Sequence, residues 1–431
     1  MRTRLVIIAI VLAAGIASLA IASQPESFTI NSLKVIFARN TATDIVSVQM
    51  YFRGGVTVLD PRQAGIEELA LSVATQASKN YPKDRLHAAL ERMDTRLGST
   101  ATKDYSSVTL QCVKQNLAES WKIFTDVLLN PAFNPADVEL ERNRTLAAIR
   151  QANDNPDAYL NDLATVAFYT QHPYQTEVHG TMETVTRFAP EELRSYLRSR
   201  CSSSQMLLVV VGNLTRPELE TLVKESFSTL PPGTSADMTA PPVQHSQPSL
   251  KIVKRDLPTN YISGLFPVPA MGTPEWYPMR MGISRLAQRL FEEVRTKRGL
   301  SYAPAAYFGP NFSNYGAIYV TAVSPDTTIK VMLAEVKRLQ DEPVPEKELR
   351  DLGNQFLTGY YLNMETNASQ ADLLARYELI GRGYQDAGKL MDRVKAVTPE
   401  AIKKVCGEYM HNLQYVLIGN PATLQIGAFM Y

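Results

Sequence analysis

The sequence of 431 residues has little histidine and cysteine and no excess of charge of either sign. Its five histidines and three cysteines are scattered along the chain, which makes a zinc site hard to assemble. Lys and Arg number 44 and Asp and Glu number 43, a net charge of +1 (44 − 43), so no broad field attracts nucleic acid or anionic lipid. With 45% hydrophobic residues, 22 Gly and 26 Pro, the composition excludes a disordered, collagenous or polytopic membrane protein.

The cysteines exclude two further classes of site. Cys112, Cys201 and Cys406 lie far apart and show no CxxC spacing, so they form neither a zinc knuckle nor a thioredoxin-like redox pair. One disulfide is possible at most. Cys112 ends an alternating stretch, 107–112, and we interpret it as a buried free thiol.

The N-terminus carries the one long apolar run of the chain. Arg2 and Arg4 precede an uncharged run from Leu5 to Ala22, which ends in small residues and is typical of a signal peptide, residues 1–22. The run is also long enough for an uncleaved membrane anchor, and this alternative stays open. We expect an exported, soluble protein, periplasmic in a bacterial cell.

The rest of the chain repeats itself around a linker. Residues 228–250 are rich in Pro, Ser and Thr and poor in charge, as linkers are, and they separate 23–227 from 251–431. Landmarks recur at offsets of 210, 209 and 207 residues, in the pairs Pro135–Pro345, Pro190–Pro399 and Gly212–Gly419. The chain is therefore predicted to use one unit twice, as two homologous domains.

Each unit mixes strand-like and helix-like patterns. Residues 46–53 and 107–112 alternate as half-buried strands do. One apolar helical stripe is formed by Ile66, Leu69, Ala70, Val73, Ala74 and Ala77, and another by Leu286, Ala287, Leu290, Phe291 and Val294. Because strands and helices interleave without strict alternation, we expect an α+β fold with helices packed on largely antiparallel sheets.

The helix expected after Gly65 carries a resemblance to a known family. The apolar stripe faces the core, so Glu68 and Ser72 lie together on a different face, with Leu71 at its margin. Here the sequence resembles the pitrilysin and insulin-degrading enzyme family, which includes mitochondrial processing peptidase. Active members have a His-x-x-Glu-His motif at this place, and a Glu some seventy-odd residues downstream is the third zinc ligand. The stretches 128–133 and 172–174 also resemble the family in order and spacing.

The resemblance also implies that the zinc chemistry has been lost. Glu68 stands at the first histidine position, Leu71 at the position of the general base, Ser72 at the second histidine position and Ala148 at about the third ligand. These side chains cannot hold zinc or activate its water, so no metal or cofactor is expected on this chain. A shift of the alignment by one residue does not help, because no histidine lies between Gly65 and Lys79.

The five histidines offer no replacement site. His172 and His179 might suggest a metal pair, but the His-Pro-Tyr segment at 172–174 resembles a structural feature of the family. His87, His245 and His411 have no partner at ligand spacing. We interpret these three as surface or capping residues.

The second half retains a segment that the family uses. Residues 291–302 resemble the stretch whose arginine and tyrosine, seven positions apart, reach the active site from the C-terminal half; Arg295 and Tyr302 match that spacing. A guanidinium and a phenol can donate hydrogen bonds to a scissile carbonyl and to the oxyanion that develops on it. Without the resemblance, the favoured interpretation is that Arg295 is a solvated charge at a helix end and Tyr302 is a ring packed in the core.

The resemblance implies that this chain forms half of a clamshell-like chamber. In some members two chains of about this length pair and one alone carries zinc. The leading hypothesis is therefore a non-catalytic subunit of an exported heterodimeric zinc peptidase, with zinc and general base in the partner and Arg295 and Tyr302 donated in trans. Peptide would dock as an added strand beside the partner's site.

Two other functions stay open. One is a purely structural subunit, like the respiratory-complex core proteins that resemble this family. The other is a free-standing periplasmic peptide-binding protein. An enzyme of another mechanism finds no support, since no Ser-His-Asp or Cys-His arrangement is recognisable.

Overall fold

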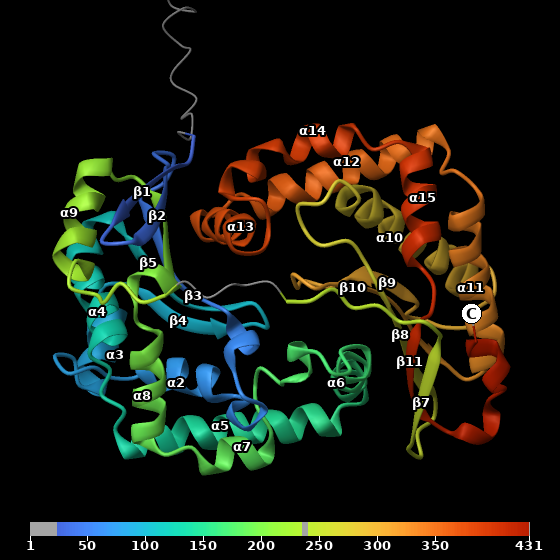
Figure 1. Ribbon diagram of the computed structural model, residues 1–431, viewed down its shortest axis with the longest axis horizontal. Coiled ribbons are helices and arrows are strands. Elements are labelled where there is room, and N and C mark those ends of the chain that lie inside the picture. Colours follow the sequence, from blue (N-terminus) through green and yellow to red (C-terminus); the bar gives the residue numbers. More distant parts are fainter. Residues whose placement is uncertain (1–23, 235–239, 431) are drawn as a thin grey trace, which may run out of the picture.

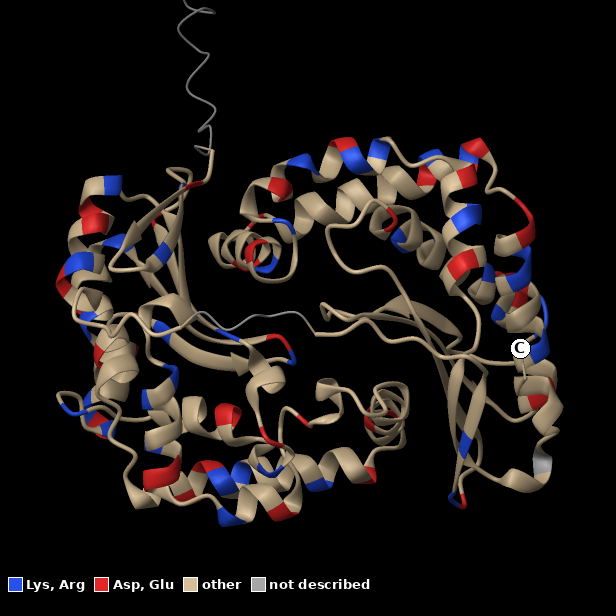
Figure 2. Cartoon of the chain, viewed as in Figure 1, with Lys and Arg blue, Asp and Glu red and all other residues tan. Residues whose placement is uncertain are grey.

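The computed structural model describes residues 24–234 and 240–430 (Figure 1). The expected signal peptide, 1–22, lies outside the described residues. Within the described ranges no helix combines the length and the hydropathy needed to cross a membrane. Lysines and arginines are interspersed with acidic residues along the helices of both halves, in keeping with the near-zero net charge (Figure 2).

The first half of the chain forms a sheet that has six strands over the described residues, in the order β1-β2-β6-β3-β5-β4. β2 runs parallel to β6, and the other neighbours are antiparallel. The strands are β1 Glu26–Ile30, β2 Leu33–Arg39, β3 Ile45–Arg53, β4 Arg96–Ala101, β5 Tyr105–Val113 and β6 Met206–Gly212. β6 consists of Val, Leu and Met apart from its last residue and is buried throughout, as a central strand requires.

The second half repeats this topology with one strand fewer. Its sheet has the order β7-β11-β8-β10-β9, and β7 runs parallel to β11 as β2 does to β6. The strands are β7 Ser249–Lys254, β8 Asn260–Pro267, β9 Ala305–Phe308, β10 Tyr315–Ala322 and β11 Gln414–Gly419. The repeat seen in the sequence is thus a repeat of structure, and the predicted α+β class is confirmed.

Some helices of the first half pack on its sheet, and others extend away from it. They are α2 Ile66–Ala74, α3 Lys83–Arg92, α4 Leu117–Leu129, α5 Pro135–Asp154, α6 Pro156–Phe168, α7 Met182–Arg187, α8 Pro190–Arg200 and α9 Arg216–Phe227. All six residues of the predicted stripe 66–77 are buried, although α2 itself ends at Ala74.

The second half has its own set of helices. They are α10 Trp276–Leu290, α11 Pro325–Asp341, α12 Glu346–Asn363, α13 Asn367–Ile380, α14 Leu390–Lys395 and α15 Pro399–Tyr409. α10 continues directly into a π-helix, Phe291–Thr296. The predicted apolar face is wrong at one position: Leu286, Leu290 and Val294 are buried, but Phe291 is 47% exposed. The Phe291 amide still bonds the Ala287 carbonyl in the α-helical pattern, and the Phe291 ring lies on the surface beside the Arg295 guanidinium, 4.8 Å from the ring centroid. The π turn follows it, with the Lys297 amide donating to the Glu292 carbonyl.

Each half covers one face of the other half's sheet with a helix (Figure 1). α6 of the first half packs on β8 and β11, where Phe168 meets Leu265 and Val416. α13 of the second half packs on β3 and β6, where Leu374 meets Tyr51. Because β3 is covered on both faces, seven of its nine residues are buried instead of the alternate ones.

Polar contacts join the halves at the same seam. The Lys34 ammonium lies 2.6 Å from the Glu378 carboxylate, and the Asn40 and Asn367 side chains share a hydrogen bond of 2.7 Å. Asp104 of the first half accepts a hydrogen bond of 3.1 Å from the backbone amide of Phe312. The two halves are therefore held by both apolar burial and directional bonds.

Candidate functional site: a degenerate metal motif and an exposed arginine–tyrosine pair

Two glycines place the helix that bears the degenerate motif. Gly65 caps α2 with a φ of +85°, a left-handed conformation that glycine adopts without strain. A Cβ built on Gly65 would lie 2.7 Å from the Cα of Gly180, so the two backbones touch. This contact brings the segment around His179 against the first turn of α2.

Glu68 faces that segment. Its Oε2 lies 2.5 Å from Nδ1 of His179, and this hydrogen bond is the main reason that the pKa of His179 is raised above its ordinary value. The nearby carboxyl groups of Asp162 and Glu177 act in the same direction. Glu68, the residue matched to the first position of the zinc motif, is thus engaged by His179.

The four positions matched to the zinc motif are only partly brought together. Glu68 and Ala148, on α5, line one cavity of about 550 Å³. Leu71 and Ser72 are not among its lining residues. Leu71 is 1% exposed and belongs to the core of the first half, so its expected place at the margin of the polar face is wrong. The Leu71 side chain packs in the hydrophobic core of the first half.

The side chains at the four positions do not fit zinc. Glu68 is the single strong ligand among them, and structural and catalytic zinc sites use at least three protein ligands. Over the described residues no three or more His, Cys, Asp or Glu side chains are grouped so that they could hold a metal ion.

The cavity holds charged residues that the sequence did not single out. Asp162 on α6 and Glu177 have raised pKa values because burial disfavours their charged forms. Lys103 lies close enough to offset part of this effect, and its own pKa is lowered by burial. No spacing in the sequence connects these residues, because they come from three segments that meet only in the fold.

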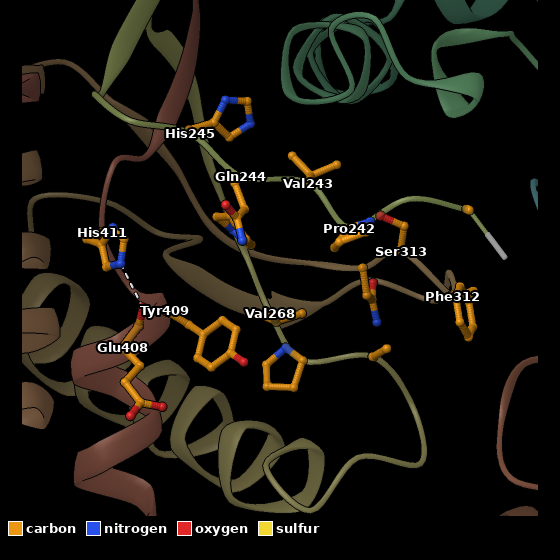
Figure 3. A pocket seen from close by; sticks show the side chains of 15 residues that line it. Pro242, Val243, Gln244, His245, Val268, Phe312, Ser313, Glu408, Tyr409 and His411 are labelled. Atoms are coloured by element: carbon orange, nitrogen blue, oxygen red, sulfur yellow. Dashed lines mark hydrogen bonds between the residues drawn. The ribbon is translucent and has the colours of Figure 1, made fainter.

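The remaining histidines have structural roles. His172 donates from Nε2 to the Pro241 carbonyl at 2.8 Å and accepts at Nδ1 from the Tyr174 amide. His245 and His411 line another cavity, of about 580 Å³, where their rings lie well apart (Figure 3). Each bonds a backbone carbonyl through Nε2, and no metal pair results.

Arg295 and Tyr302 lie at the end of the π-helix, on the surface. The Arg295 guanidinium lies 4.0 Å from the centroid of the Tyr302 ring and 4.8 Å from that of Phe291. Tyr302 is 78% exposed. Among the described residues neither side chain makes a hydrogen bond or an ion pair, so the donors of both remain available. Neither residue lines the cavity beside Glu68.

Comparisons with known proteins show the family of the chain. Residues 34–182 match the family model "Insulinase (Peptidase family M16)", and 187–356 match "Peptidase M16 inactive domain". A zinc protease of Mycobacterium leprae, named as uncharacterized, is 26% identical over 339 residues, 75% of each chain.

Solved structures share the whole fold. A structure described as a peptidase M16 inactive domain from Pseudomonas fluorescens superposes with a TM-score of 0.84 at 18% identity, over 92% of this chain and 98% of that one. The first half of a periplasmic protease from Escherichia coli superposes with a TM-score of 0.75 at 16% identity, over 96% of both chains.

Proposed function

Because the chain belongs to peptidase family M16 and lacks that family's zinc ligands, we propose that it is the non-catalytic subunit of an exported heterodimeric zinc peptidase. A homologous partner subunit supplies the zinc ion and the general base. This chain, as two domains at 23–227 and 251–431 with a linker between them, completes the substrate chamber. One contrast carries the proposal. The positions matched to the general base and to the third ligand hold hydrocarbon side chains, Leu71 and Ala148, whereas Arg295 and Tyr302 keep unbonded donors at the surface.

The geometry of the pair supports a role in trans. A ring exposed as far as that of Tyr302 contributes little to the stability of its own chain, so a role in core packing does not account for it. Stacking of Arg295 between two aromatic rings limits the motion of the guanidinium while leaving its N–H groups free. Two pre-oriented donors of this kind can bind a substrate carbonyl oxygen and stabilise the negative charge that develops on it.

Reconstitution tests the proposal. The chain, a homologous subunit with an intact His-x-x-Glu-His motif, and an equimolar mixture of the two are each assayed for peptide hydrolysis with zinc. The mixture is expected to be far more active than either subunit. Appreciable zinc-dependent turnover by this chain alone would falsify the proposal.

Substitutions in the pair separate catalysis from assembly. Arg295→Ala or Tyr302→Phe is expected to lower turnover by the complex about 10²- to 10³-fold, the usual effect of losing one oxyanion donor. Assembly, measured by light scattering, should stay intact. Arg298→Ala is the matched control, since Arg298 is a nearby exposed arginine bound to Glu293. Unchanged turnover in all three variants would instead mean a purely structural subunit. A chain that stays monomeric and binds peptides alone would be a binding protein.

A further inference from the structure

A third cavity, of about 750 Å³, lies on the first half and is separate from the one beside Glu68. It is bounded by α8, the end of α4 and the segments that follow α4 and α9. Its size falls in the range of small-molecule sites.

The charged side chains that line this cavity are all cationic: Lys79, Arg194 and Arg198. Arg194 is already engaged, because it donates to the carbonyls of Pro131 and Ala132 and pairs with Glu191. Over the part of the chain that the structure describes, the Lys79 ammonium and the Arg198 guanidinium make no hydrogen bond or ion pair. Both residues are exposed, so two cations stand at the open side of the cavity without a counter-charge from the protein.

Neighbouring carboxylates do not neutralise them. Asp126, near the end of α4, accepts hydrogen bonds from the Asn80 and Asn130 side chains at 2.9 Å, and it is not among the lining residues. Glu191 is used by Arg194 at 3.2 Å. The site therefore favours an anion.

Apart from Asn130, whose amide donates to Asp126, the rest of the wall is mainly apolar. Leu128, Leu197 and Leu230 are buried and line the cavity. Cys201 also lines it; its thiol lies 3.6 Å from the Leu128 carbonyl, and burial raises its pKa to about 12, so it stays neutral. A wall of leucines beside unpaired cations is complementary to an amphipathic anion.

We propose that this cavity binds an aliphatic carboxylate, with its chain along the leucines and its carboxylate between Lys79 and Arg198. A peptide fits less well, because its amides need backbone partners. The Pro131 and Ala132 carbonyls are already taken by Arg194, and Pro131 and Pro231 have no N–H to donate.

Calorimetry on the purified chain tests the ligand chemistry. Decanoate, kept below its micelle-forming concentration, is expected to bind with one site per chain, at least about tenfold more tightly than decanol or decyltrimethylammonium. The Lys79→Gln/Arg198→Gln variant should lose at least about tenfold in decanoate affinity. Lys224→Gln, an exposed cation on α9 outside the cavity, is the control and should bind as the unmodified chain does.

Equal affinity for decanol, or full affinity in the double variant, would overturn the proposal. Tighter binding of N-acetyl-Leu-Leu than of decanoate would overturn the aliphatic assignment.

Discussion

Asp104 is a buried acid at the contact between the halves. The Tyr174 hydroxyl donates to one of its oxygens and the Phe312 amide to the other, while Lys103 and Arg376 lie near. Burial outweighs these contacts and raises its pKa to about 6 from 3.8. The folded protein therefore holds this proton more tightly than the unfolded chain does.

The expected consequence is a pH-dependent stability with a definite sign. Because the folded-state pKa is raised, the contribution of Asp104 is complete below pH 3.8 and is lost as pH rises through about 6. The loss is on the order of 3 kcal/mol. In urea unfolding between pH 4 and 7.5, Asp104→Asn should gain stability relative to the unmodified chain by about this amount. Parallel profiles for the two chains would contradict the assignment.

At the scale of elements, the start of α2 depends on the contact between Gly65 and Gly180. Gly65→Ala would place a Cβ against the Gly180 backbone at a φ of +85° and is expected to lower the free energy of unfolding by about 1–3 kcal/mol. Chemical denaturation measures this change. Gly407→Ala on α15 is the control: its Cβ would meet nothing within 4 Å, so that variant should be as stable or slightly more stable.

Elements with strong periodicity were predictable, and elements shaped by distant contacts were not. The segments 46–53 and 66–77 recur as β3 and as α2 with the residues just after it. The stripe of α2 is buried as its spacing predicts, whereas the half-buried alternation expected for β3 is wrong, because α13 of the other half covers its second face. The π-helix was missed because Phe291 continues an α-helical face in the sequence. Its cause lies in the hydrogen bonding at its end, which hydrophobic spacing does not report.

The candidate site also contains residues that the sequence identified and residues that it did not. Glu68, Leu71, Ser72 and Ala148 were identified through the resemblance, by placing the family's motif on the sequence from Gly65 onward. Asp162 and Glu177, which share the cavity, come from segments that carry no common pattern, so their proximity follows only from the tertiary packing of this half, in which α6 packs on α5 and α5 on α2.

At the scale of the whole molecule, Phe168 shows how the halves depend on each other. It is fully buried on α6 and contacts the Tyr315 ring of the other half at 5.8 Å between centroids. Phe168→Ala is expected to cost about 3–5 kcal/mol. Because the seam is shared, this loss should destabilise both halves together.

Two tryptophans report the halves separately, Trp121 in the first and Trp276 in the second. In a Trp276→Phe variant the fluorescence of Trp121 follows urea unfolding of the first half, and in a Trp121→Phe variant the fluorescence of Trp276 follows the second half. Phe168→Ala should shift both midpoints equally, whereas Tyr361→Ala, at an exposed position on α12, should shift neither. A shift at Trp276 alone would mean that the halves unfold independently.

The mutual covering of sheets by α6 and α13 also bears on how such a chain evolves. Once each unit covers a face of the other unit's sheet, deleting either unit would expose an apolar sheet face on the one that remains. Neither copy can then be discarded after a duplication. Loss of metal ligands removes no part of this mutual support. A lineage without metal ligands can therefore still be selected to keep the entire double unit.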